Sequence, residues 1–105
     1  MTFQENLAAM PAIDHLSGLN ICNQQGETVH HIPAAPGKLG SLKLYHALSQ
    51  EFDGVLNAQA AERGLQLFAE HVADAQANPG KHPNIDLLFQ VKAENQTLLL
   101  QPQTA

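Results

Sequence analysis

Cysteine is nearly absent from this chain, and no long apolar run occurs in it. Cys22 is the one cysteine among 105 residues, so an internal disulfide is impossible, as in most proteins of a reducing compartment. No apolar stretch approaches the ~20 residues that a membrane-spanning helix needs. The N-terminus MTFQENLAAM has neither the basic start nor the apolar stretch of a signal peptide. We therefore expect a cytoplasmic protein with no membrane partner.

Basic residues are also few. Ten acidic residues against five basic ones give a formal net charge of -5 with histidine neutral. Nucleic-acid binding normally needs clustered Lys and Arg to displace counterions from phosphates. The five basic residues are instead scattered along the chain, at Lys38, Lys43, Arg63, Lys81 and Lys92. We expect no nucleic-acid partner.

The length and composition are those of one small domain. A chain of 105 residues that is 44% hydrophobic and 14% charged can bury a core and fold unaided. Two domains would leave each with too little core. We expect a single domain over residues 1–105.

Local patterns predict the elements of the N-terminal part. Thr2 and Glu5 have the spacing of a capping box, which indicates a short helix at the start of the chain. From Leu16 the apolar residues alternate as in a half-buried strand. A glycine-containing turn at 24–27 and the run at 28–32 then predict a hairpin.

Helical spacing dominates the central part. Residues 33–40 are rich in Pro and Gly and predict a loop before a helix whose cap is Ser41 and whose end is near Gly54. Asn57 is a good cap for the longest helix, which we expect to continue until Pro79.

The C-terminal part has two interpretations. Residues 84–94 fit a helix capped by Asn84, whereas 86–92 could pair with 97–101 as a second hairpin. The start signals at Pro83 and Asn84 favour the helix, with 97–101 as a third strand. The predicted fold is α+β: a small antiparallel sheet of about three strands, made from the N-terminal hairpin and the C-terminal strand, with three or four helices packed mainly on one face.

The third strand also suggests a function. Leu98, Leu99 and Leu100 do not alternate with polar residues, so both faces of that strand are expected to be buried. A sheet with helices on one face achieves this most simply by pairing with a second copy. No nucleophile has a supporting base nearby in sequence, so the interpretation leans against an enzyme, and no cofactor is identified. The leading hypothesis is therefore a non-enzymatic interaction or regulatory domain that acts as a homodimer.

A family resemblance extends over nearly the whole chain. The segments NLAAMPAIDHL, PGKLGSLKLYHALSQEF and AAERGLQLFAEHVADAQANPGKHPNIDLL resemble a family of small uncharacterised bacterial proteins, a domain of unknown function. The PGKHPNID part is the most specific. The resemblance implies a bacterial protein of about this length with no additional domain. It implies no activity, substrate or catalytic residue.

The first candidate site is a glycine-rich loop that leads into a helix. Gly37, Lys38, Gly40 and Ser41 could combine free backbone N–H groups, the positive end of a helix dipole and one full charge. That combination suits a small phosphate or carboxylate ligand, although the spacing is not that of a P-loop. The alternative is that the glycines only permit the turn and Ser41 only caps the helix.

The second candidate site uses histidine. Six histidines are many for this length, and His71 and Asp74 are three residues apart in the longest predicted helix, with His82 in the next loop. These three could hold one metal ion in a metal-binding protein or a metal-dependent hydrolase. The alternative is a solvated helix face with a half-buried histidine, because neither HExxH nor CxxC is present.

Three of the other histidines fit no shared site. His30 and His31 are adjacent in a predicted strand, so one should point inward and the other into solvent. His46 lies off the apolar stripe of its helix and is expected to be exposed.

Overall fold

The computed structural model describes residues 1–105 as an α+β fold with one four-stranded antiparallel sheet. The strand order is β2-β1-β4-β3. The elements along the chain are α1 (Phe3–Ala8), β1 (Leu16–Cys22), β2 (Thr28–Pro33), α2 (Leu39–Glu51), β3 (Val55–Leu56), α3 (Ala58–Phe68), α4 (His71–Ala77), α5 (Pro83–Glu94) and β4 (Leu98–Thr104).

The predicted hairpin and the predicted C-terminal strand together form the centre of the sheet. Leu19 of β1 lies opposite Ile32 of β2 in the hairpin and opposite Pro102 on its other side. The first and last long strands are therefore neighbours, and β4 extends along the full length of β1. The last strand is longer than the sequence predicted, because the polar residues after Leu100 continue to pair with β1.

The fourth strand, β3, was missed by the sequence interpretation of about three strands. It consists of Val55 and Leu56, which pair with Leu99 and Leu98 of β4. Two residues cannot show an alternating pattern, so the sequence offered no period from which to recognise a strand.

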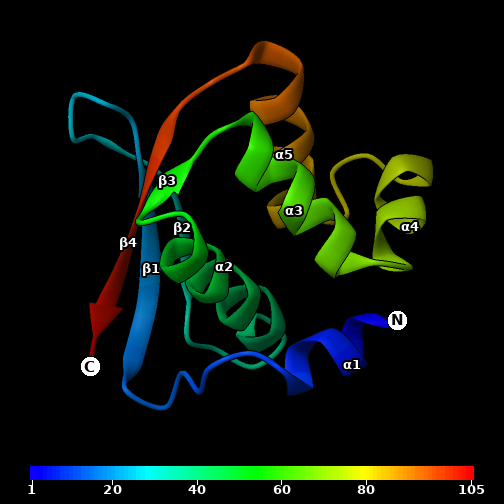
Figure 1. Ribbon diagram of the computed structural model, residues 1–105, viewed down its shortest axis with the longest axis horizontal. Coiled ribbons are helices and arrows are strands. Elements are labelled where there is room, and N and C mark those ends of the chain that lie inside the picture. The colour runs from blue at the N-terminus through cyan, green and yellow to red at the C-terminus, as the bar shows by residue number, and fades with distance from the viewer.

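Figure 1 shows the helices on one side of the sheet, as expected, with β1 and β4 seen nearly edge-on. The core between them contains 20 buried hydrophobic residues. The helices pack closely around Gly64 of α3, where an added Cβ would lie 2.8 Å from Cδ1 of Leu88 and 3.0 Å from Cδ1 of Leu48. The sheet face opposite the helices has no such cover.

The long helix predicted from Asn57 to Pro79 is in fact two helices, so the structure has five helices rather than three or four. Asn57 caps α3 as expected, its side chain accepting from the N–H of Ala60. The helix then ends at Phe68, because Ala69 adopts φ 54° and reverses the chain before α4 begins. No glycine or proline marks the break at Ala69, so the apolar residues continue at helical spacing across it.

Both helices next to the candidate sites begin at residues other than those expected. The N-cap of α2 is Lys38, and Ser41 lies in the first turn instead of capping it. The N-cap of α5 is His82, and Pro83 occupies the first helical position, where its fixed φ is favourable. The helical interpretation of 84–94 is confirmed, but Asn84 is inside the helix and not its cap. The capping box at Thr2 is present as predicted.

The histidines of β2 and α2 differ in burial. His30 points toward the helices and is half-buried, whereas His31 is exposed, as predicted. The expectation for His46 was wrong. Its side chain is 5% exposed on α2 and lies edge-on to His15, with ring centroids 5.6 Å apart.

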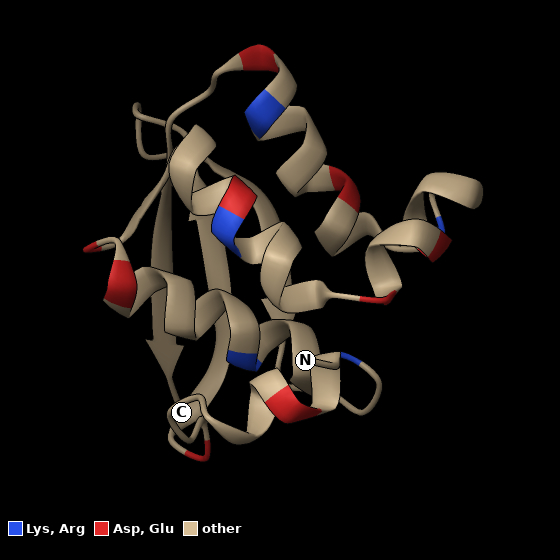
Figure 2. Cartoon of the chain, turned by 45° about the vertical axis from the view of Figure 1, so that its right-hand side comes forward, with Lys and Arg blue, Asp and Glu red and all other residues tan.

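The charged residues are distributed over the whole molecule. Figure 2 shows the basic positions separated from one another, on helices and in loops. None of the helices combines the length and the apolar character required to cross a bilayer.

Candidate functional site

The two candidate sites predicted separately from the sequence meet at one cavity. Its volume is about 500 Å³, and it lies where α1, the start of α2 and the start of α5 come together. Residues Gly37 to Ser41 line one side, and His71 and His82 line another. Asp74 is not among the lining residues. The remaining members of the lining are Phe3, Gln4, Leu7, Phe68, Lys81, Pro83, Asn84 and Ile85.

The first turn of α2 contributes backbone donors to the cavity. Gly37, at φ 83°, turns the chain into the helix. No side chain caps the helix start, and the N–H groups of Leu39, Gly40 and Ser41 have no acceptor within the protein. This 13-residue helix therefore presents unsatisfied donors and the positive end of its dipole at the cavity.

The first turn of α5 is uncapped in the same way. No side chain accepts from its backbone, Pro83 has no N–H, and the N–H of Asn84 has no partner in the protein. The next two N–H groups both donate to the carbonyl of His82. The 12-residue α5 thus directs a second positive dipole end toward the same space.

The side chain of Asn84 is the most buried polar group in the lining, at 8% exposed. Its Oδ1 lies 2.7 Å from Nε2 of His30 on β2, and its backbone carbonyl accepts from the hydroxyl of Tyr45 at 2.5 Å. These contacts fix the start of α5 against the sheet and α2. The Nδ2 group of Asn84 has no acceptor within the protein, and it is not sealed from solvent, because the only fully buried side-chain atom without a partner is Nδ1 of His46.

The charge of the lining is opposite to that of the whole protein. The cavity has Lys38 and Lys81 at its edge and contains no Asp or Glu, although the chain has twice as many acidic as basic residues. Lys38 makes no ion pair or side-chain hydrogen bond in the structure. Its ammonium group is therefore available to a ligand.

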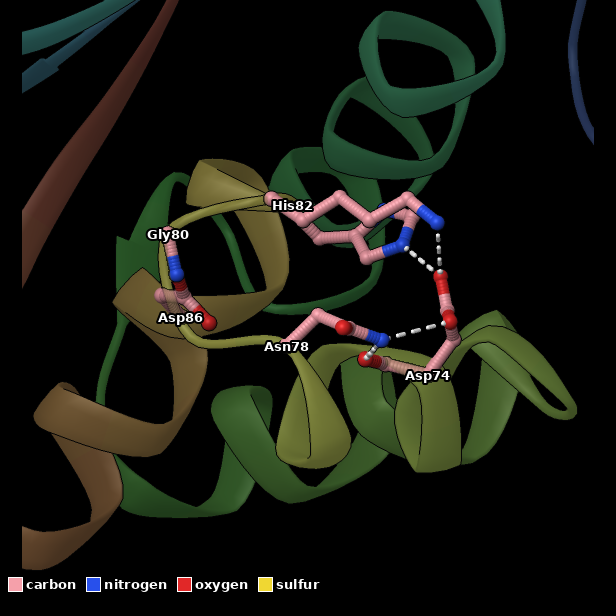
Figure 3. Close-up of polar contacts among 6 residues, drawn as sticks. Asp74, Asn78, Gly80, His82 and Asp86 are labelled. Atoms are coloured by element: carbon pink, nitrogen blue, oxygen red, sulfur yellow. Dashed lines mark hydrogen bonds and ion pairs between the residues drawn. The ribbon is translucent and has the colours of Figure 1, made fainter.

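The loop between α4 and α5 is held by acidic side chains that lie behind the lining. Figure 3 shows Asp74 as the centre of this network. Its Oδ2 lies 2.5 Å from Nε2 of His82 and 3.1 Å from Nζ of Lys81, and Asn78 donates to Oδ1. The hydrogen bonds from His82 and then Lys81 lower the pKa of the Asp74 carboxyl. On the other side of the loop, the N–H of Gly80 donates to Asp86.

This network joins Asp74 and His82 but does not include His71. Asp74 and His82 are in direct contact, whereas the rings of His71 and His82 have centroids 6.2 Å apart. No three His, Cys, Asp or Glu side chains are grouped so that they could hold a metal ion. The metal hypothesis stays a prediction from sequence spacing.

An aromatic cluster forms the apolar wall of the cavity. The ring of Phe3 stacks on Phe68, with centroids 5.4 Å apart, and meets the ring of His71 edge-on at 4.9 Å. The N–H of Phe3 donates to Oε1 of Glu70, which lowers the pKa of that carboxyl. Gly40 permits the contact with α2, because an added Cβ there would lie 3.2 Å from the Phe3 ring.

Sequence reasoning missed Asn84, Lys81 and Phe3 as members of this site. One signal was visible in the sequence: the tripeptide Pro-Gly-Lys occurs at 36–38 and again at 79–81, each time shortly before a helix. The second copy was interpreted only as a helix exit, although the repetition could have pointed to two similar helix starts. It could not show that the two starts face one another.

Comparison with known families identifies the chain. Residues 3–102 match the family described as an uncharacterized protein conserved in bacteria, DUF2322. The chain belongs to this family. All the cavity-lining residues lie within the matched part of this DUF2322 member. No curated protein and no solved structure matches the chain.

Proposed function

We propose that this DUF2322 protein binds a small anionic ligand, carrying a phosphate or carboxylate group, in the cavity between the starts of α2 and α5. The observation that carries the proposal is the convergence of two uncapped helix starts on one cavity whose charged lining residues are all basic. The unbonded Nδ2 of Asn84 adds a nearly buried side-chain donor.

The energetics favour an anion over a neutral or cationic ligand. A helix N-terminus stabilises a negative charge by about 0.3–1 kcal/mol at an exposed site, and here two helices act on the same space. A full charge about 4 Å away adds ~1 kcal/mol even in water, and Lys38 has no competing partner. Carboxylates of the protein would compete for these donors, but none lines the cavity.

Calorimetric titration with inorganic phosphate near pH 7 tests the proposal. We expect saturable binding that weakens as salt is added, because the attraction is electrostatic. Lys38→Gln should reduce the affinity about 5-fold, which corresponds to a loss of ~1 kcal/mol in binding free energy. Lys92→Gln is the matched control, because Lys92 lies near the end of α5 away from the cavity, where it pairs with Glu62. Absence of binding, or an equal effect of both substitutions, would contradict the proposal.

A second proposal, homodimerisation, rests on the sheet face that no helix covers. Leu99 is half-buried on that face, beside Cys22 of β1. Val55 of β3 lies opposite Leu99 on its other side, whereas the next row across that face, His31, Asn20 and Gln101, is polar, so the apolar area is smaller than the three consecutive leucines suggested. For this reason ligand binding is the better supported function.

A further inference from the structure

A second hollow adjoins the anion cavity. Its volume is about 540 Å³, and it shares Gln4, Leu7, Leu39 and Gly40 with the first. The two hollows therefore meet along the contact between α1 and the first turn of α2. Beyond the shared residues, the lining of the second hollow has four apolar residues, Ala8, Ile13, Leu16 and Ala34, and two charged ones, Asp14 and Lys43.

Leu39 occupies the junction of the two hollows and is unusually exposed. It is 48% exposed, and only Met1 and Val29 are more exposed among the large hydrophobic residues. As the first residue of α2, it has an unbonded N–H group in the anion cavity and an apolar side chain at the boundary with the second hollow. Leu39 therefore combines a backbone donor for an anion with an apolar side chain.

We propose that the ligand is a single-chain amphiphile: an anionic head group in the cavity between α2 and α5, with an apolar chain that crosses Leu39 into the adjoining hollow. This inference rests on the proposed anion binding and adds the chemistry of the rest of the molecule. Each hollow falls within the roughly 300–1,000 Å³ that small-molecule sites usually occupy. Lys38, Lys81 and the uncapped Asn84 line only the first hollow, whereas four of the six residues found only in the second are apolar, which sets the direction of the chain.

Straight-chain carboxylates of increasing length provide the test. Acetate, butanoate, hexanoate and octanoate, each below its micelle-forming concentration, are titrated into the full-length protein by calorimetry. Burial of one methylene is worth about 0.8 kcal/mol, so the affinity should rise up to about 4-fold per methylene until the chain fills the second hollow. Octylammonium, with the same chain and the opposite charge, should bind much more weakly than octanoate.

Leu39→Gln separates the chain from the head group. It should flatten the rise in affinity from acetate to octanoate. Val29→Gln is the control, because Val29 is exposed to a similar extent, 52%, but lies on β2 and lines neither hollow. A wild-type protein that binds phosphate and acetate but gains nothing from longer chains would overturn the amphiphile and leave the proposed function standing. A protein that binds neither phosphate nor acetate would overturn both.

Lipid vesicles distinguish a free amphiphile from a membrane surface. The protein should not float with phosphatidylglycerol vesicles, because the adjoining hollows would hold one separate chain. Binding to vesicles without any response to soluble carboxylates would overturn the proposal.

Discussion

The Nε2 atom of His82 lies 2.5 Å from Oδ2 of Asp74, so the N-cap residue of α5 is held by a carboxylate from α4. The same carboxylate contacts Lys81 at 3.1 Å. One acidic side chain behind the cavity thereby orients two of the groups that line it.

The Asp74 network should make stability fall at acid pH. The hydrogen bonds from His82 and then Lys81 lower the pKa of Asp74 below its ordinary value of 3.8. The folded state therefore keeps the carboxylate ionised where the unfolded state is protonated. This contribution is complete above the unfolded pKa and is lost as the pH falls through the folded value.

Urea denaturation as a function of pH measures this contribution. Asp74→Asn should be less stable than the wild type at neutral pH and should lose less stability on acidification. Asp53→Asn is the control, because the Asp53 side chain is exposed and takes no part in an ion pair or hydrogen bond. Parallel pH profiles for the wild type and Asp74→Asn would show that the network does not stabilise the fold.

His46 should add a second pH dependence, nearer neutrality. Burial, and then the adjacent His15, lower the pKa of His46, and its Nδ1 has no hydrogen-bond partner. The unfolded state therefore binds a proton near pH 6.5 more readily than the folded state, so stability should decline as the pH falls below that value. Between pH 7 and pH 5, His46→Leu should lose less stability than the wild type. The control His31→Gln, at an exposed site, should lose as much stability as the wild type. The interpretation is wrong if His46→Leu retains the full wild-type decline.

Gly64→Ala should destabilise the protein through overpacking. The added Cβ would lie 2.8 Å from Cδ1 of the buried Leu88, so that side chain or one of the two helices must shift. Overpacking in a core costs about 1–3 kcal/mol, although alanine favours the helix. Gln66→Ala, at an exposed position of the same helix, should have little effect or stabilise slightly. Equal unfolding free energies for the wild type and Gly64→Ala would contradict this packing.

If the protein dimerises through the open sheet face, its mass in solution should be that of two chains. Sedimentation at micromolar concentration should give a dimer for the wild type and a monomer for Leu99→Asp, because a charge on that face would oppose its burial. Gln101→Glu, on the same face, distinguishes loss of apolar contact from the effect of charge. A wild type that sediments as a monomer ends this proposal.

Local signals in the sequence predicted most of the elements, and tertiary contacts explain the rest. Thr2 and Asn57 were recognised as caps because capping needs only neighbouring residues. The break at Ala69 and the two-residue strand β3 have no periodic signature of their own. His46 is buried although it lies off its helix's apolar stripe, because α2 has neighbours on more than one side.

The candidate site was predictable in parts and not as a whole. The glycine loop at Gly37 and the histidine cluster near His82 could each be recognised from residue type and spacing. Their meeting depends on the contacts of Asn84 with His30 and Tyr45, which bring the start of α5 to the sheet and α2. These contacts join residues 54 and 39 positions apart, and no local pattern encodes them.

Amide chemical shifts during titration with inorganic phosphate test the central claim most directly. The N–H groups of Gly40, Ser41 and Asn84 have no acceptor in the protein and should show the largest downfield shifts as they bind the anion. Saturable changes that are centred on these three residues, and reduced in Lys38→Gln, are the predicted result. Absence of change at all three while other parts of the molecule respond, or no response at all, would contradict the anion-binding cavity.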